Sequence, residues 1–308
     1  MTRSALIALT CLSLAACAFS DHATKPSTLG TPRSSDDLVA VLDTPGPVTL
    51  ETIASCDWEV DRSGLINLKH PTARAAGLTD GPEPIQVFFH VIRHPTKGVF
   101  LVDTGVEKAL RDDPDHAAVR GLVASVMHRE KMTFHLPLGE WLAQQPSPPA
   151  GVFLTHLHLD HVMGMPDVPA TTPLYAGPGE TSARSVLNLL VAPNIDRALA
   201  GKEALSEWPY AGDPAQRFAG VVDIFGDGSV WALAVPGHTH GSSAYLVRTT
   251  TGPVLLTGDA SHTRWGWEHD VEPGTFSDEK PKDAESLAAL KKFVAAHPGV
   301  EVRLGHQR

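Results

Sequence analysis

Residues 151–164 place four side chains that can bind a metal ion directly after a short apolar run. The run, residues 152–154, predicts a buried strand. The side chains that follow it are His156, His158, Asp160 and His161. In an extended segment the alternating positions 156, 158 and 160 share one side, whereas His161 points the other way. One loop could therefore supply ligands to two ions.

Three more residues that can bind metal follow apolar runs later in the chain, and each has a glycine directly before it. They are His238, Asp259 and His306. Taken singly, each is more often a turn residue than a ligand. Strand ends at one edge of a sheet lie close together, so the four loops can surround a single point. Together the loops offer five histidines and two aspartates, and burying so many unpaired groups would be costly without a bound ion.

This donor set predicts a metal site. Nitrogen and oxygen ligands without a thiolate favour Zn²⁺, and Mn²⁺ or Fe²⁺ also fit. Two ions a few Å apart could hold a hydroxide between them, because a metal lowers the pKa of bound water toward ~7.

Short strands separated by turn residues are predicted over much of the chain. They include residues 85–93 and 98–102, which predict a hairpin, and residues 221–225, 230–235, 243–247, 253–257 and 300–304. Residues 283–296 predict an amphipathic helix. Packing two strand-rich halves face to face, with helices outside, predicts an α/β fold with four layers in the order αββα.

The first residues predict an export signal. A single basic residue, Arg3, precedes an apolar stretch over residues 5–14 that is too short to span a bilayer. Residues 14–17 resemble the lipobox of bacterial lipoproteins, which implies a lipid anchor on Cys17 facing the periplasm, and Ala18 favours the outer membrane. We therefore expect a signal peptide over residues 1–17, a flexible tether over 18–47 and a folded domain over 48–308.

The composition and the charge of the chain argue against a nucleic-acid partner. The chain has 308 residues and a formal net charge of −10, with 42% hydrophobic and 19% charged residues. These values are ordinary for a globular protein, and no basic run follows residue 25, so we expect no nucleic-acid partner. With Cys17 lipidated, Cys56 would have no cysteine to pair with. We expect Cys56 to be a small buried residue rather than a nucleophile.

The ordered ligands resemble the signature of the metallo-β-lactamase superfamily over residues 48–308. The matching residues are His156, His158, Asp160, His161, His238, Asp259 and His306, together with Asp103. The resemblance implies a first ion bound by His156, His158 and His238. It implies a second ion bound by Asp160, His161 and His306. Asp259 would bridge the two ions. Asp103 could be a further metal ligand, but we expect it to support a loop by accepting hydrogen bonds from backbone N–H groups.

Within this superfamily the pattern most resembles N-acyl-homoserine lactone lactonases. A carboxylate at Asp259 argues against β-lactamases, which usually carry Cys or Ser there, and residues 283–287 also fit the lactonases. The chain departs from them at His262, where Tyr is common, and at Gln307, where Asp is usual. His262 could donate a hydrogen bond to a substrate oxygen, or it could be a solvated loop residue. The expected substrate is a small-molecule lactone or similar ester. We expect the bridging hydroxide to attack its carbonyl carbon and Asp160 to pass a proton to the leaving group.

Other functions and substrate-facing residues remain open. The alternatives are a β-lactamase, a thioesterase or a phosphodiesterase of the same superfamily, or a non-catalytic metal-binding lipoprotein. We expect specificity to lie in residues 111–135 and 192–220. Six residues could contact a substrate or could instead pack in the core. Trp208 and Tyr210 could face the substrate as aromatic side chains, and an acyl-chain wall could be formed by Met163, Met165, Trp265 and Trp267.

Overall fold

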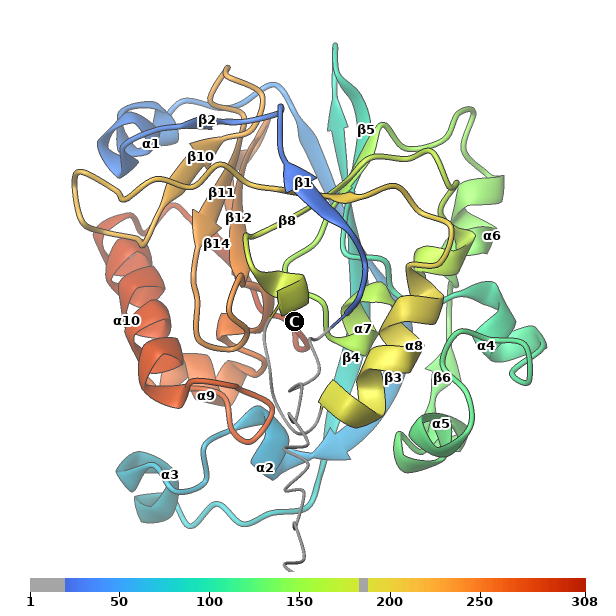
Figure 1. Cartoon of the computed structure of the whole chain (residues 1–308). Helices are drawn as coiled ribbons and strands as arrows, with labels where there is room; N and C mark the ends of the chain where they lie inside the picture. Colours follow the sequence, from blue (N-terminus) through green and yellow to red (C-terminus); the bar gives the residue numbers. More distant parts are fainter. Residues whose placement is uncertain (1–19, 183–187) are drawn as a thin grey trace, which may run out of the picture.

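Two β-sheets lie face to face at the centre of the molecule, and helices cover their outer faces (Figure 1). The computed structural model describes residues 20–182 and 188–308. The predicted signal peptide and the lipid anchor on Cys17 lie outside these residues. The arrangement of layers confirms the predicted four-layer αββα sandwich.

The first sheet contains eight strands in the order β1-β9-β8-β7-β5-β4-β3-β6. Their bounds are β1 Thr24–Pro26, β9 Leu205–Glu207, β8 Leu174–Ala176, β7 Gly151–Phe153, β5 Gly98–Val102, β4 Pro82–His94, β3 Thr49–Asp61 and β6 Thr133–Phe134. β4 and β5 form the predicted hairpin. β5, β7, β8 and β9 run parallel, so their carboxyl ends share one edge of the sheet.

The second sheet contains six strands in the order β14-β13-β12-β11-β10-β2. Their bounds are β14 Glu301–Arg303, β13 Gly252–Leu256, β12 Ser243–Thr249, β11 Val230–Ala234, β10 Val221–Asp223 and β2 Thr31–Pro32. β13 and β14 are parallel neighbours, with Leu256 opposite Arg303. This register brings the loops that carry Asp259 and His306 side by side.

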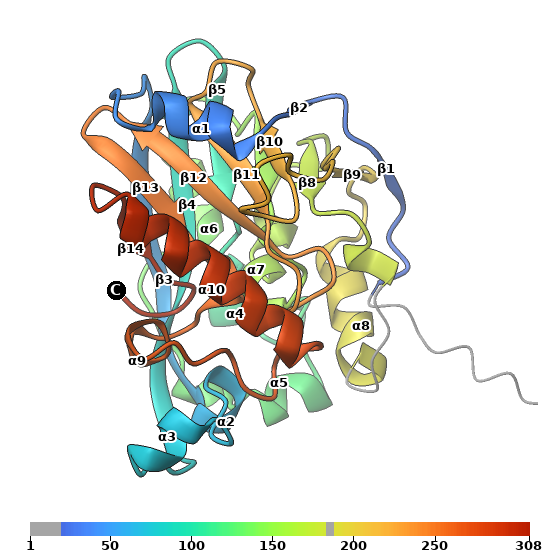
Figure 2. The same cartoon turned by 90° about the vertical axis from the view of Figure 1, so that its left-hand side faces the viewer.

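The helices differ in length and place. Their bounds are α1 Ser35–Leu42, α2 Arg62–Leu65, α3 Pro71–Ala75, α4 Lys108–Asp112, α5 Leu122–Val126, α6 Leu138–Ala143, α7 Leu159–Val162, α8 Asn188–Ala198, α9 Arg264–Glu268 and α10 Lys280–Ala296. The predicted helix over residues 283–296 is the greater part of α10, which crosses the outer face of the second sheet (Figure 2). Within the described residues, no helix is both long and apolar enough to cross a membrane.

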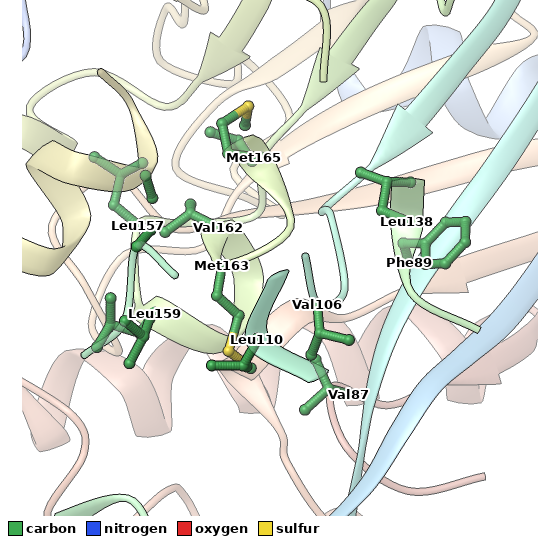
Figure 3. Packing of buried hydrophobic residues seen from close by; sticks show 14 of the residues in the cluster. Val87, Phe89, Val106, Leu110, Leu138, Leu157, Leu159, Val162, Met163 and Met165 are labelled. Atoms are coloured by element: carbon green, nitrogen blue, oxygen red, sulfur yellow. The ribbon is translucent and has the colours of Figure 1, made fainter. Parts of the chain in front are cut away.

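Three hydrophobic clusters fill the interfaces between the four layers. Between the sheets, the Phe153 ring of β7 stacks on the Tyr245 ring of β12, with ring centroids 5.8 Å apart. Outside the first sheet, Phe89 packs in one cluster with Leu110 of α4 and Leu138 of α6 (Figure 3). Outside the second sheet, α1 and α10 complete the third cluster. Each sheet is therefore packed on both faces, which fixes where its strand ends lie.

The flexible tether predicted over residues 18–47 is wrong for most of the part that the structure describes. β1 pairs with β9 of the first sheet, and β2 pairs with β10 of the second. α1 begins with a capping box at Ser34 and buries Leu38 and Leu42 in the core. Two strands of two or three residues carry no local signal, because only their pairing with distant strands makes them regular.

Candidate metal centre

All seven predicted ligands meet at one edge of the two sheets. His156 and His158 follow β7, and Asp160 and His161 lie within the short helix α7. The nitrogen and oxygen ligand atoms form two groups, and within each group the atoms lie within 4.8 Å of one another. The first group is His156, His158, His238 and Asp259, and the second is Asp160, His161, Asp259 and His306. Asp259 alone belongs to both groups.

The Oδ2 atom of Asp259 lies at the centre of this cluster. It is 3.7 Å from Nε2 of His156 and 3.4 Å from Nε2 of His238. It is also 3.3 Å from Nε2 of both His161 and His306. Two ions that each contact one group would therefore share this carboxylate, as the resemblance to the superfamily implies.

The buried atoms of the cluster fit divalent cations. Nε2 of His156, Nε2 of His161 and Oδ1 of Asp259 are buried and form no hydrogen bond with any described residue. Such orphaned polar atoms are costly in a protein interior unless something binds them. Five imidazoles and two carboxylates without a thiolate are donors suited to Zn²⁺, Mn²⁺ or Fe²⁺.

Burial keeps the imidazoles of the first group neutral. It lowers the pKa of His158 to about 4 and lowers the pKa values of His156 and His238 well below their usual range. A neutral imidazole has a lone pair available for a metal ion. These three side chains are therefore ready to bind an ion at neutral pH without losing a proton.

The second group carries more negative charge. Burial alone would lower the pKa of His306, but the carboxylates of Asp259 and Asp160 raise it to about 10. Burial would also lower the pKa of His161, yet Asp259 and the other nearby carboxylates raise it well above its usual range. In the absence of an ion, protons on these imidazoles balance the carboxylates. A divalent cation can replace those protons.

Asp103 supports the loop after β7, as predicted. Its Oδ1 accepts a hydrogen bond from the backbone N–H of Thr155 at 2.8 Å, and its Oδ2 accepts one from the Thr155 hydroxyl at 2.9 Å. Oδ2 also lies 2.8 Å from Nδ1 of His161. A hydrogen bond at Nδ1 directs Nε2 of His161 toward the cluster. Cys56, by contrast, is fully buried, and burial raises the pKa of its thiol to about 12.

Ser277 and Asp283 orient His238, and the sequence did not indicate this role. The Ser277 hydroxyl donates to Oδ2 of Asp283, so its oxygen can accept from Nδ1 of His238 at 3.2 Å. This arrangement leaves Nε2 of His238 as the atom that faces the other ligands. The nearby glycine is also required, because a Cβ at Gly237 would lie 2.2 Å from the Asp283 nitrogen.

His262 is buried inside the cluster, so the interpretation of a solvated loop residue is wrong. Its Nδ1 lies 3.1 Å from the Leu65 carbonyl oxygen, and its Nε2 lies 3.0 Å from Oδ2 of Asp259. Gln307 has a structural role at the other departure from the lactonase pattern. Its side chain accepts from the Arg264 N–H at 2.9 Å and donates to Glu83 at 3.1 Å.

A cavity of about 850 Å³ opens beside the ligands. Its walls include Asp160, Asp259, His262 and His306 together with many apolar residues, among them Trp58, Leu65, Ile85, Leu122, Val123, Val126, Met127, Leu159, Val191 and Phe276. Three large hydrophobic side chains are exposed among the described residues, and all three line this cavity. They are Leu122 at 68%, Val126 at 68% and Phe276 at 41% exposure. Such a concentration indicates a binding surface for an apolar group.

The residues proposed from sequence as an acyl-chain wall do not line this cavity. Met163 and Met165 are fully buried in the cluster outside the first sheet (Figure 3). Trp265 packs against the same cluster. Trp267 packs against the cluster that contains α10. Core packing, the alternative for these residues, is their observed role.

The two segments expected to set specificity differ in outcome. Residues 111–135 supply the α5 side of the cavity, whereas residues 192–220 supply none of its lining. Trp208 is buried between the sheets and its indole N–H donates to the Tyr245 hydroxyl at 3.0 Å. Tyr210 packs against the same inter-sheet cluster.

The chain is similar in sequence to a known protein family and to several of its relatives. A model described as the metallo-beta-lactamase superfamily matches residues 82–306, a range that includes all seven ligands. The gamma-lactamase MBL2 of Gibberella moniliformis is 32% identical over 174 residues, which cover 53% of this chain and 70% of that protein. The N-acyl homoserine lactonase AttM of Rhizobium johnstonii is 26% identical over 227 residues, which cover 72% of this chain and 82% of that protein.

A solved structure has the same fold. It is an N-acyl homoserine lactone hydrolase with the product N-hexanoyl-L-homoserine bound at its catalytic metal centre. The two structures superpose with a TM-score of 0.57 at 18% identity, and the match covers 86% of this chain and 94% of the other. At this identity the likeness shows a shared fold alone.

Proposed function

Because the chain belongs to the metallo-beta-lactamase superfamily, we propose that it is a two-metal hydrolase that opens a lactone or a similar ester carrying an apolar acyl group. The observation that carries this proposal is the pair of ligand groups sharing Asp259 beside an apolar cavity. Metal-dependent hydrolysis is the activity of the family. Our proposal goes beyond the activity of the family in two respects, which are the number of ions and the substrate.

The ligand residues form two sets, and each set would hold one ion. His156, His158 and His238 would hold the first ion. Asp160, His161 and His306 would hold the second, with Asp259 shared. Bound Zn²⁺ or a similar ion supplies Lewis acidity and an activated water at neutral pH. The fit rests on the orphaned nitrogen and carboxylate atoms described above.

Asp160 and His262 are the residues of this chain best placed to assist the reaction. Both line the cavity, and the Asp160 side chain is 20% exposed. Burial opposes ionisation of Asp160, but the neighbouring imidazoles lower its pKa below the usual range, so it is ionised and can accept and then pass on a proton. For His262, Nδ1 faces the Leu65 carbonyl oxygen and Nε2 lies 3.0 Å from Oδ2 of Asp259, so this residue would assist by orienting the Asp259 carboxylate.

The cavity and the relatives together favour an acyl lactone. The cavity volume of about 850 Å³ exceeds what a lactone ring needs, and its walls are mostly apolar. The related proteins from Rhizobium johnstonii and from the solved structure are described as N-acyl homoserine lactone hydrolases. Because another relative is described as a gamma-lactamase, a cyclic amide is the second candidate substrate.

A substrate panel tests the proposal. Purified zinc-loaded protein would be given acyl lactones, γ-lactams, β-lactams, thioesters and phosphodiesters, and the products would be separated and quantified by chromatography. The acyl lactone is expected to give the highest kcat/KM. A lactone that is the poorest substrate of the panel would refute the proposed function. A faster γ-lactam would favour the second candidate.

The exposed apolar residues of α5 predict a dependence on acyl-chain length. Leu122→Ser combined with Val126→Ser is expected to lower kcat/KM for a ten-carbon acyl lactone about tenfold, because each lost methylene contact weakens binding by up to ~0.8 kcal/mol. A four-carbon acyl lactone, too short to reach α5, should react at the parent rate. Ser125→Ala changes a neighbouring exposed position of α5 that is outside the lining, and it serves as the control. Equal losses for both chain lengths would contradict this role.

A further inference from the structure

A buried carboxylate outside the ligand set joins the two loops that carry the first group of ligands. Glu180, in a short helix over Glu180–Ser182, is only 1% exposed. Its Oε2 accepts from the Leu157 backbone N–H at 3.0 Å. Its Oε1 accepts from the Gly241 N–H at 2.7 Å and from the Thr239 hydroxyl. Leu157 lies between His156 and His158, and Thr239 directly follows the third ligand of that group.

We propose that Glu180 is a positioning residue for the first metal ion, holding the loop of His156 and His158 at a fixed separation from the loop of His238. The distance that depends on this separation is 2.8 Å, from Nδ1 of His158 to Nε2 of His238. The inference rests on the proposed two-metal site but not on the identity of the substrate.

The loop of His238 and the segment before Glu180 are in close backbone contact. A Cβ on Gly177 would lie 1.8 Å from the Gly241 carbonyl oxygen. A Cβ on Gly241 would lie 2.7 Å from the Pro178 carbonyl oxygen. Glycine is therefore required on both sides of this contact. The close approach lets a single carboxylate reach donors on both loops.

The chemistry of the contact requires a carboxylate. Three donors from two loops converge on Glu180, and an ionised carboxylate accepts several hydrogen bonds while presenting no N–H of its own. Burial raises the pKa of this carboxyl to about 7, although the three donors oppose that rise. A glutamine would turn an NH₂ group toward one of the loops and leave a buried donor unsatisfied.

The second group of ligands has a separate support. Asp103 holds Thr155 and Nδ1 of His161, and it makes no hydrogen bond with the loop of His238 among the described contacts. Loss of the Glu180 contact should therefore disturb the first ion more than the second. This selectivity separates a positioning role from a general effect on stability.

The test compares Glu180→Gln with the parent protein at pH 8, with both loaded with zinc and then with cobalt. Each protein is dialysed against graded chelator, and the retained metal is counted. We expect one of the two ions to leave Glu180→Gln at a roughly 10–100-fold lower chelator concentration, the size of effect seen when groups that orient metal ligands are removed. The visible spectrum of the cobalt form should change, and kcat should fall with little change in KM.

Glu107→Gln is the matched control. Glu107 is also buried, at 2% exposure, and it accepts a hydrogen bond from the Ala118 N–H at 2.7 Å, away from both ligand groups. Burial raises its pKa to about 7 as well. The control should lose both ions at the parent chelator concentrations. If Glu180→Gln does not fold, Thr239→Val removes a single donor and should weaken the same ion by a smaller factor.

The loss or retention of each ion decides the proposal. Selective loss of one ion from Glu180→Gln or Thr239→Val supports the proposal. Retention of both ions at parent affinity overturns it, and so does a parallel loss of both ions. A parent protein that binds no ions refutes the proposed two-metal site itself, whereas a parent that binds two ions but opens no lactone leaves the role of Glu180 standing.

Discussion

Asp259→Asn is expected to lower kcat/KM by about a thousandfold or more and to reduce the metal content below two ions per chain. Asp259 is the residue common to both ligand groups, and four ligand nitrogens lie within 3.7 Å of its Oδ2. Asparagine keeps the shape but removes the charge. Its NH₂ group would also face the cations, whereas a carboxylate offers oxygen to both.

The measurement is steady-state kinetics on the best substrate of the panel together with metal analysis of the same sample. Asp270→Asn is the control, because Asp270 is a surface residue on the same segment that pairs with Lys291 and belongs to neither ligand group. Its left-handed backbone, with a φ of 57°, also suits asparagine. A fully active Asp259→Asn protein would refute the shared-ligand assignment.

Removal of the metal ions is expected to lower the melting temperature by about 10 °C or more. A ligand present at a thousand times its Kd stabilises the folded protein by ~4 kcal/mol, so two such ions contribute ~8 kcal/mol, and for a protein of this size each kcal/mol shifts Tm by roughly 1.5 °C. The physical reason lies in the cluster itself. Without ions, Nε2 of His156 and Nε2 of His161 remain buried without hydrogen bonds among the described residues.

Thermal unfolding followed by circular dichroism, before and after treatment with chelator, measures this shift. Adding back Zn²⁺ should restore the parent Tm. A rise in Tm on adding Mn²⁺ or Fe²⁺ instead would show that the site also accepts that ion. Asp259→Asn should show a smaller chelator-induced change than the parent, since it starts with fewer ions. If the ions are removed and Tm does not move, the cluster does not owe its stability to metal.

The ligand set could be predicted from the sequence because its signal is local. Imidazoles and carboxylates are rarely buried, so His156 and Asp160 directly after an apolar run already indicate a function. The same reasoning found Asp259, and the order of the ligands indicated the superfamily and with it the four-layer sandwich. Family membership and fold are both confirmed.

The walls of the cavity could not be predicted in this way. Apolar residues are common throughout the chain, and only packing decides which of them face the core. Met163 lies two residues from a ligand but is buried in the core, whereas Phe276 and Leu122 reach the cavity from distant segments. The pairing of β1 and β2 with the two sheets was missed for the same reason.

The sequence by itself therefore indicated the chemistry of this protein, because the seven predicted metal ligands stand out by residue type and by their place at strand ends. Only the tertiary structure decided how those ligands are held and what can approach them. Glu180 and Ser277 form hydrogen bonds to loops far away in the chain, Asp283 acts through Ser277, and no spacing along the sequence encodes such contacts. The four-layer packing brings them together.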